Sequence, residues 1–391
     1  MEMTCCSSPA LAAEGREPVG RSDMEFSWKD FGWWRPLLGM GILLLLAVTV
    51  LAFGLEHEGK PSLKIGFVTI GDIREAGWNA SQYQGIKAAA DKFGAQLLVR
   101  DNVKENNGEC PAAIRELIDE GAGMIFLASY SYSTEARELV EEYPDIAFAT
   151  NSAEVHARNM TAYFVRMYQA RYLSGALAGL RTKTNIIGYV AAMPNSEVNR
   201  GINAFALGVR RTNPGARVVV MWTGAWQDEA REEANAQRLI REKGADVLTY
   251  HQDEDAACRI ADRYGADFIG YNALLTGYSA HYLTSVICRW DNYYIDIVQR
   301  YLKGELNSVK NRWLGIEHGA VALSEFSPAV SPDTVRQMDA LRQELASGKL
   351  IFTGELYDNK GVLRCAPDEA IPDDVLLERM NWLVQGVEVL E

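Results

Sequence analysis

Short apolar, β-branched segments alternate with amphipathic helical segments after Pro61, and this alternation limits the fold more than any other feature of the sequence. Strands are predicted at Lys64–Ile70, Gln96–Arg100, Met124–Ala128, Ala147–Thr150, Ile186–Ala191, Val218–Trp222, Asp246–Tyr250 and Asp267–Tyr271. Helices are predicted between them at Ala80–Phe93, Pro111–Glu120, Thr134–Glu142, Arg200–Thr212 and Glu229–Lys243. Such alternation is typical of right-handed βαβ units with a mostly parallel sheet. Because the pattern restarts after a strand at Ala162–Val165 and a long helix at Tyr168–Arg181, we expect an α/β protein with two sheets.

The N-terminal region contains a segment that fits a membrane better than a globular core. Nineteen residues without a charge run from Leu37 to Leu55, and a helix of that length spans about 28 Å, close to the hydrocarbon thickness of a bilayer. We expect a transmembrane anchor at residues 37–55 after a cytoplasmic tail at residues 1–36, in which Met24 is an alternative start. A cleaved signal segment is the alternative to an anchor.

Length, charge and cysteine spacing exclude several classes of protein. A chain of 391 residues can form two domains, and 39 basic against 52 acidic side chains argue against a nucleic-acid partner. Four cysteines of the body are spaced singly and form no metal-binding motif: Cys110, Cys258, Cys288 and Cys365. Disulfides and buried free thiols both remain open.

The sequence lacks the common catalytic motifs. It has no G-x-G-x-x-G, Walker lysine, G-x-S-x-G or H-E-x-x-H motif. The densest polar cluster, His251–Asp255, contains a single histidine, and we expect Asp253 or Glu254 to cap a helix at Asp255–Tyr264 or to bond a ligand. We therefore predict no metal, no cofactor and no enzymatic activity.

Ligands of open α/β sheets bind beyond the carboxyl ends of the strands. The loops predicted there carry aromatic and amide side chains, namely Trp78, Asn79, Tyr130, Asn151, Trp226, Gln252 and Asn272. Trp222 and Trp290 also lie near predicted strand ends, and two tryptophans on opposite lobes would clamp a flat ring. Packing in a core is the alternative for each. These residues predict a recognition cleft rather than a catalytic centre.

Six segments of the body are distinctive: KIGFVTIGDIREAGWNASQYQGIKAAA, YFVRMYQARYLSGALAGLRTKTNIIGYVAA, NRGINAFALGVRRTNP, WTGAWQDEAREEANAQRLIREKGADVLTYHQD, FIGYN and FTGELYDNKG. In order and spacing, from residue 63 to about 388, they resemble the basic membrane protein family of periplasmic substrate-binding proteins, which includes purine-nucleoside receptor lipoproteins. The W-x-x-x-W-x-D and G-A-D-V-L-T-x-H patterns are similar to those of purine-nucleobase (adenine-type) binders.

The resemblance implies two Rossmann-like lobes of type I periplasmic-binding-protein architecture, joined by three crossovers and preceded here by the transmembrane helix. The first lobe is expected at residues 62–165 plus about 270–320, and the second at 166–269 plus about 321–391. The implied function is an extracytoplasmic, monomeric protein that delivers a purine base or nucleoside to an ABC permease and its ATPase. A membrane-tethered sensing domain that signals through a partner is the alternative.

By the family pattern, Trp78 and Trp226 are expected to stack on the two faces of a base. The other expected ligand-binding residues lie on loops and crossovers: Asn79, Ser129, Tyr130, Asn151, Arg166, Asp228, Gln252, Asp253, Asn272 and Trp290. Asn272 replaces an acidic residue that grips ribose in nucleoside-binding members, and the segment CRWDN around Trp290 lacks their lysine. The resemblance therefore favours a free base over a nucleoside.

Overall fold

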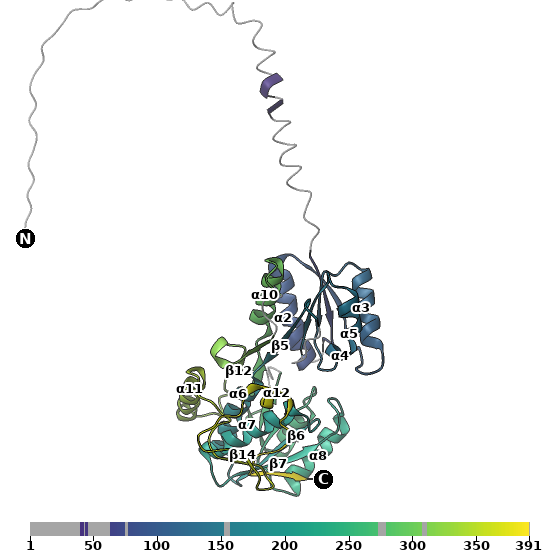
Figure 1. Ribbon diagram of the computed structural model, residues 1–391. Coiled ribbons are helices and arrows are strands. Elements are labelled where there is room, and N and C mark those ends of the chain that lie inside the picture. Colours follow the sequence, from purple (N-terminus) through teal and green to yellow (C-terminus); the bar gives the residue numbers. More distant parts are fainter. Residues whose placement is uncertain are drawn as a thin grey trace, which may run out of the picture. The chain divides into compact units, whose positions relative to one another are not determined.

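Two sheets of mostly parallel strands form the frame of the body, and helices pack on their faces (Figure 1). The computed structural model describes residues 40–42, 44–45, 63–74, 77–151, 157–272, 279–306 and 311–390. Residues Ser62–Glu391 form one compact unit by their internal contacts. The α/β fold with two sheets, expected from the alternating sequence pattern, is confirmed.

The first sheet has the strand order β11-β5-β4-β3-β1-β2, and all neighbouring strands run parallel. Its strands are β1 (Lys64–Val68), β2 (Gln96–Arg100), β3 (Met124–Leu127), β4 (Ala147–Thr150), β5 (Met160–Val165) and β11 (Asn311–Leu314). Its helices are α2 (Trp78–Phe93), α3 (Glu109–Asp119), α4 (Tyr132–Glu135), α5 (Arg137–Glu142) and α10 (Trp290–Leu302). The single helix predicted at Thr134–Glu142 is wrong, because two short helices, α4 and α5, meet at Ala136.

The second sheet has the order β12-β10-β9-β8-β6-β7-β15, in which β12 pairs antiparallel with β10. Its strands are β6 (Ile186–Ala191), β7 (Arg217–Trp222), β8 (Val247–His251), β9 (Asp267–Tyr271), β10 (Tyr282–Cys288), β12 (Val321–Leu323) and β15 (Val387–Leu390). The remaining helices are α6 (Met167–Arg181), α7 (Ser196–Thr212), α8 (Glu229–Arg241), α9 (Ala256–Tyr264), η3 (Ile316–His318), α11 (Pro332–Ala346) and α12 (Asp373–Glu378). Strands β13 (Leu356–Tyr357) and β14 (Leu363–Cys365) form a separate hairpin.

The chain passes between the two sheets three times: after β5, after β10 and after β11. Strand β10 pairs parallel with β9 in the second sheet. The predicted lobe division, which placed the chain from about residue 270 in the first lobe, is therefore wrong for β10. The first-lobe segment on this part of the chain begins with α10, which packs on α2.

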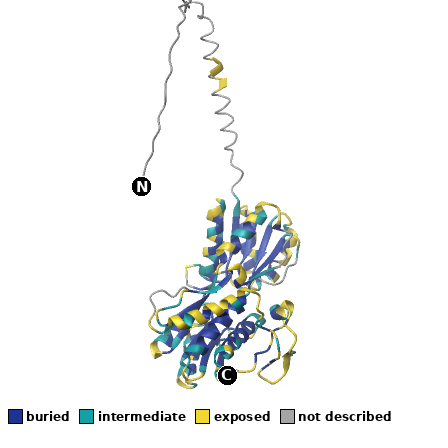
Figure 2. Ribbon diagram, turned by 90° about the vertical axis from the view of Figure 1, so that its left-hand side faces the viewer, coloured by how far each residue is buried: buried dark blue, intermediate teal, exposed yellow. Residues whose placement is uncertain are grey.

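Burial follows the layers that the strand and helix patterns predict (Figure 2). Every residue of β3, β4 and β5 is buried, as expected for strands covered on both faces. Helix α7 begins where the Asn195 side chain accepts a hydrogen bond from the Val198 amide at 2.9 Å, and its last turn carries Arg210 and Arg211. An N-cap side chain and basic residues in the last turn both stabilise a helix.

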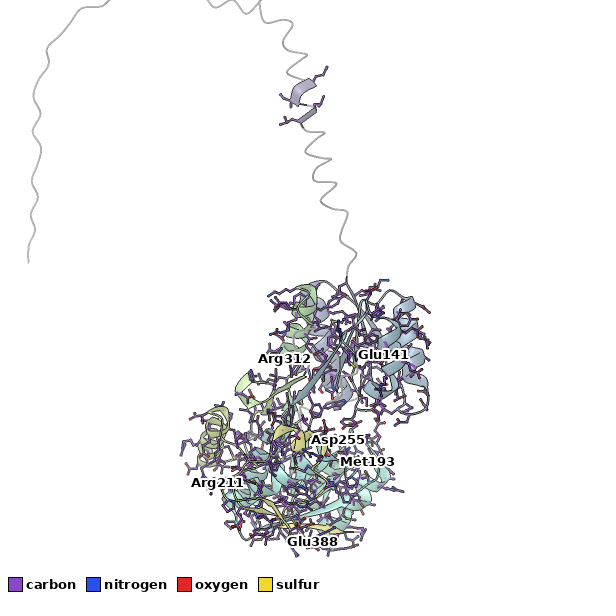
Figure 3. The ribbon with its side chains drawn as sticks, viewed as in Figure 1. Glu141, Met193, Arg211, Asp255, Arg312 and Glu388 are labelled. Carbon is purple, nitrogen blue, oxygen red and sulfur yellow. The ribbon has the colours of Figure 1, made fainter. Side chains whose placement is uncertain are left out.

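Loops after the strands of the second sheet share one end of that sheet. Figure 3 shows Met193 and Asp255, which follow β6 and β8, at this end, whereas Glu388 in β15 lies away from it. None of the helices that the structure describes is both long and apolar enough to cross a bilayer. Most of the predicted anchor at residues 37–55 lies outside the described residues.

Candidate ligand-binding cleft

Loops at the carboxyl ends of the two sheets lie close to one another. A Cβ atom built on Gly77, just before α2, would lie 2.6 Å from the carbonyl oxygen of Asp253, which follows β8. A Cβ built on Gly71, after β1, would lie 3.1 Å from the Gln227 side-chain nitrogen. The strand-end loops of the first and second lobes are therefore in contact, as the rule for ligand sites in α/β sheets leads one to expect.

Trp78 stands at the start of α2 with its indole orientation set by two contacts. Its Nε1 donates a hydrogen bond to the Ala128 carbonyl at the end of β3, at 3.0 Å. Its ring meets the Trp290 ring edge-on, with centroids 5.3 Å apart. Trp78 is half-buried, whereas Trp290 is 1% exposed and packs among Tyr163 and Tyr294. The buried Trp290 ring therefore packs against the half-buried Trp78 ring and helps to fix its orientation.

Two asparagines of the first lobe differ in the hydrogen bonds that their side-chain amides make. The Asn79 Oδ1 atom accepts hydrogen bonds from the Thr69 hydroxyl at 2.5 Å and the Gly71 amide at 3.3 Å, so it braces the loop after β1. Asn151, after β4, is buried, and its Nδ2 has no hydrogen-bond partner among the described residues. A buried amide nitrogen without a partner is unfavourable by itself, so Asn151 is available to a ligand.

A carboxylate that the sequence analysis missed organises the loop after β3. The Ser129 hydroxyl donates to Glu105 Oε1 at 2.6 Å, and the Ser131 amide donates to the same oxygen at 2.8 Å. Tyr130 between them is 44% exposed. Glu105 lies in the loop after β2, so the strand-end rule applied to that loop would have indicated it.

On the second lobe, Trp226 rests against a buried pair of rings. Its centroid lies 5.9 Å from that of His251, whose Nε2 is 3.0 Å from the Tyr271 hydroxyl. Gln252 is buried beside them, and its Nε2 donates to the Thr223 hydroxyl at 2.7 Å while Oε1 has no partner. Asp228 is the N-cap residue of α8, and its side chain accepts a hydrogen bond from a backbone amide of that helix. The contact stabilises the helix rather than leaving the carboxylate to a ligand.

Carboxyl groups from both lobes interact within the cleft. Burial raises the pKa of the Asp253 carboxyl to about 7, and neighbouring carboxylates, foremost that of Glu197, add to the rise. Burial also raises the pKa of Glu197, with Arg200 opposing and Glu105 adding to the shift. Helix α9 begins at Ala256, and its N-cap residue Asp255 makes no side-chain cap hydrogen bond. The expected capping by Asp253 or Glu254 is therefore wrong, and their bonding to a ligand stays a prediction. Carboxylate oxygens in this place favour ligands that donate hydrogen bonds.

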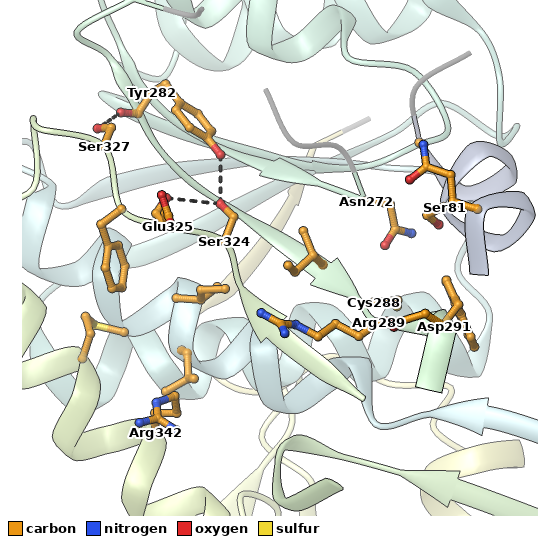
Figure 4. Close-up of a pocket in the computed structure, with 18 of the residues that line it drawn as sticks. Ser81, Asn272, Tyr282, Cys288, Arg289, Asp291, Ser324, Glu325, Ser327 and Arg342 are labelled. Atoms are coloured by element: carbon orange, nitrogen blue, oxygen red, sulfur yellow. Dashed lines mark hydrogen bonds between the residues drawn. The ribbon is translucent and has the colours of Figure 1, made fainter. Parts of the chain in front are cut away.

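Asn272, at the end of β9, lines a groove of about 1210 Å³ that also contacts Ser81 and Trp290 (Figure 4). Asn272 is 6% exposed and has a positive φ of 51°. Within the part of the chain that the structure describes, neither its Oδ1 nor its Nδ2 has a hydrogen-bond partner. Figure 4 places Asn272 and Ser81 at one side of this groove and Arg342 at the other. Asn272 is therefore a second buried amide available to a ligand.

Arg166 contacts a crossover rather than a strand-end loop. Its guanidinium donates to both Asp373 oxygens, at 2.9 and 2.5 Å, and to the Tyr168 hydroxyl at 3.1 Å. Its Cζ lies 4.1 Å from the centre of the Trp313 ring. These contacts join the segment before α6 to α12 and to β11, so this side chain is engaged where the chain passes between lobes.

The structure assigns several of the expected residues supporting contacts, and among the twelve only Asn272 and Trp290 line the groove. The sequence analysis missed Glu105 and Glu197, whose charges act on each other and on Asp253, because it favoured aromatic and amide side chains. Among the described residues, no group of three or more histidine, cysteine or acidic side chains is placed to hold a metal ion. Free thiols are found at Cys110, Cys258, Cys288 and Cys365.

Comparison with known proteins agrees with this fold. The sequence profile of a family described as "ABC transporter substrate-binding protein PnrA-like" matches residues 62–360. The chain is 30% identical over 351 residues to a purine-binding protein of Brucella abortus, covering 88% of this chain and 99% of that protein. It is 31% identical over 340 residues to a Haloferax volcanii protein provisionally named as the glucose-binding protein of an ABC transporter, covering 86% and 82%. A solute-binding protein structure from Conexibacter woesei has a TM-score of 0.62 at 20% identity, covering 74% and 98%, and shows the two-lobed fold alone.

Proposed function

Because this chain belongs to the PnrA-like family of ABC transporter substrate-binding proteins, we propose that it captures a purine nucleobase or a related flat heterocycle between its lobes. The captured ligand is delivered to a permease and its ATPase, and the chain catalyses no reaction. The observation that carries the proposal is the pair of half-buried indoles on opposite lobes, Trp78 at the start of α2 and Trp226 in the loop after β7. The purine-binding relative from Brucella abortus supports the same ligand class.

Stacking supplies affinity but little selectivity in this scheme. A base stacked on an aromatic side chain contributes about 1–3 kcal/mol in single-stranded nucleic-acid sites, and every base has a π-face. Selectivity therefore needs hydrogen bonds to ring nitrogens and exocyclic groups. Three buried amides are suited to this, since Asn151, Gln252 and Asn272 each keep at least one atom without a partner.

Ligand-driven closure follows from the placement of these groups. A ligand that touches Trp78 on one lobe and Trp226 on the other makes both contacts only when the lobes approach. Its differential affinity for the closed state therefore shifts the equilibrium toward closure. We assign the predicted segment at residues 37–55 the role of tethering the body outside the cytoplasmic membrane, which raises its effective concentration near the permease. Extraction of membranes at alkaline pH tests the tether, because a cleaved or peripheral protein would be released.

Calorimetric titration of the purified chain tests the ligand. The panel is adenine, guanine, hypoxanthine, uracil, adenosine, guanosine and glucose, with tryptophan fluorescence followed in parallel. We expect one purine base to bind more tightly than its nucleoside and to quench the fluorescence. Tighter binding of the nucleoside would show that a ribose is accommodated, and tight binding of glucose alone would refute the purine proposal.

A matched pair of variants separates stacking from general damage. Trp226→Ala removes one face of the clamp, whereas Tyr264→Ala removes a side chain that is 43% exposed at the end of α9. We expect only Trp226→Ala to weaken purine binding. Equal affinity for both variants and the unmodified chain would exclude the clamp.

A further inference from the structure

Helices α2 and α10 both begin at the groove that Asn272 lines. Their N-cap residues are Gly77 and Arg289, and neither start is capped by a side chain. The two helices cross closely, because a Cβ built on Gly85 of α2 would lie 2.9 Å from the backbone carbonyl carbon of Trp290. The chain from Gly77 to Gly85 rises about 12 Å in a helix, so the two helix starts lie roughly that far apart. The positive ends of two helix dipoles therefore meet at one groove.

The first turns of both helices hold backbone N–H groups that have no acceptor. Among the residues that line the groove, Ala80 stands in the first turn of α2, and Trp290 and Asp291 open α10. Within the part of the chain that the structure describes, no oxygen accepts a hydrogen bond from the backbone amides of these three residues. Such amides attract anions together with the helix dipole.

The Arg289 side chain adds a full positive charge at the start of α10. It is exposed and reaches into the groove (Figure 4). Among the described residues, its guanidinium makes no ion pair and donates no hydrogen bond, whereas Arg342 in the same groove pairs with Asp339 at 3.5 Å. The groove also contains the exposed side chains of Asp291 and Glu325, and neither is paired with Arg289. The charge of Arg289 is therefore free to meet a ligand.

Asn272 gives the groove a buried donor on the side of the second lobe. Its side chain is 6% exposed and lines the groove, and neither of its polar atoms has a hydrogen-bond partner among the described residues. A buried amide without a partner is unfavourable, so the site is incomplete without a ligand. Its Nδ2 atom can donate to an oxygen of the ligand, as the helix amides and the guanidinium can.

We propose that this groove holds an oxyanion, a carboxylate or phosphate group, which the ligand carries on a short arm. The inference rests on the proposed function, because it concerns another part of the same ligand. Trp290 lines the groove and meets the Trp78 ring with centroids 5.3 Å apart, so a base stacked on Trp78 lies next to the groove. The groove measures about 1210 Å³, whereas pockets of about 300–1,000 Å³ hold drug-sized ligands. A bare base leaves this space and its donors unused, and an acidic derivative of a purine fills them.

Two adenines that differ in charge test the oxyanion. One carries a carboxymethyl arm on a ring or exocyclic nitrogen, and the other carries the corresponding neutral carbamoylmethyl arm of almost the same shape. With the arm placed on either nitrogen in turn, we expect the acid of at least one pair to bind more than tenfold tighter than its amide in calorimetric titration. A phosphonomethyl arm then shows whether phosphate or carboxylate fits better. Equal affinities of acid and amide in both pairs would overturn the proposal.

A matched pair of arginine variants locates the charge effect. Arg289→Gln removes the charge that faces the groove, and we expect it to abolish the preference for the acid. Arg342→Gln is the control, because this arginine lines the same groove but pairs with Asp339, and the preference should persist in it. A preference that survives in Arg289→Gln would refute the site.

Inorganic phosphate separates this inference from the purine proposal. A ligand that binds only the folded state raises its stability. At constant ionic strength, with sodium chloride as the replacement salt, we expect phosphate to raise the Tm of the wild type more than that of Arg289→Gln. If no adenine derivative binds but this difference is found, the oxyanion site stands and the purine proposal falls. If adenine binds and the acid gains nothing over the amide, the purine proposal stands and the oxyanion site falls.

Discussion

The indole of Trp78 meets that of Trp290 at an interplanar angle of 84°, with ring centroids 5.3 Å apart. This edge-on contact joins the start of α2 to the start of α10, two helices that are far apart in sequence and packed together in space. Edge-to-face aromatic pairs add about 0.5–1.5 kcal/mol beyond burial. The contact leaves Trp78 oriented before any ligand arrives, which limits the entropy lost on binding.

Replacement of Trp78 by Leu tests its role as a stacking platform. We expect purine affinity to fall roughly 10- to 100-fold, which corresponds to the loss of one stacked face. Calorimetric titration of the variant gives this number. Trp313→Leu is a comparison of the same residue type outside the strand-end loops, since its ring packs on Arg166. Equal losses in the two variants would contradict a specific role for Trp78.

Gly77 lies where the strand-end loops of the two lobes are in contact. Its φ is +124° and a Cβ there would lie 2.6 Å from the Asp253 carbonyl oxygen, so Gly77→Ala is expected to hold the lobes apart. Ligand affinity should drop more than tenfold, and small-angle scattering with ligand should report a larger radius of gyration. Gly94→Ala controls for backbone strain, because Gly94 also has a positive φ, +63°, with nothing near its Cβ position. Normal closure in Gly77→Ala would show that this contact does not govern it.

The Asp253 carboxyl makes ligand binding depend on pH near neutrality. Its pKa of about 7 means that it gains a proton as the pH falls below that value. If the ionised form accepts a hydrogen bond from a ring N–H or amino group, affinity is expected to rise as the pH increases through 7. Asp253→Asn should flatten this dependence, whereas Asp145→Asn, at an exposed site, should not. A dependence unchanged in Asp253→Asn would remove this group from the site.

Glu232 makes stability depend on pH through a different linkage. It is fully buried, accepts from the Ala257 amide at 2.9 Å, and burial raises its pKa from 4.5 to about 8. Between these values the folded state binds more protons than the unfolded state, so stability falls as the pH rises from about 4.5 to 8. The full loss is at most on the order of 5 kcal/mol.

Replacement of Glu232 by Gln removes this linkage. The variant should match the wild-type Tm near pH 5 and exceed it above pH 8, since Gln keeps an oxygen for the Ala257 amide. Glu138→Gln, at an exposed position on α5, should leave the pH profile as it is. Parallel Tm profiles for the wild type and Glu232→Gln would place the linkage elsewhere.

Local sequence patterns were enough to predict most strands and helices of the two sheets. Strands β2, β4, β6 and β9 have the predicted bounds. Strands β4 and β6 are almost entirely buried and therefore apolar along most of their length, whereas the edge strand β2 has no buried residue. The sequence analysis placed β10 in the wrong lobe. The lobe of this strand is set by its pairing with β9, and the five buried or half-buried apolar residues of β10 do not specify that pairing. The position of Trp226 on the loop after β7 likewise followed from the order of elements, whereas Trp78 is the first residue of α2.

Contacts between distant segments decide which polar side chains near the strand ends remain available to bind a ligand. Asn79 and Asn151 look alike as strand-end asparagines, yet Asn79 bonds the Thr69 hydroxyl and the Gly71 amide while Asn151 Nδ2 has no partner. Trp290 and Trp78 both follow strands, yet only Trp78 keeps an exposed part. Residue type sets what a side chain can donate or accept, but hydrogen-bond partners and burial arise only when remote elements pack, and these decide which groups remain for a ligand.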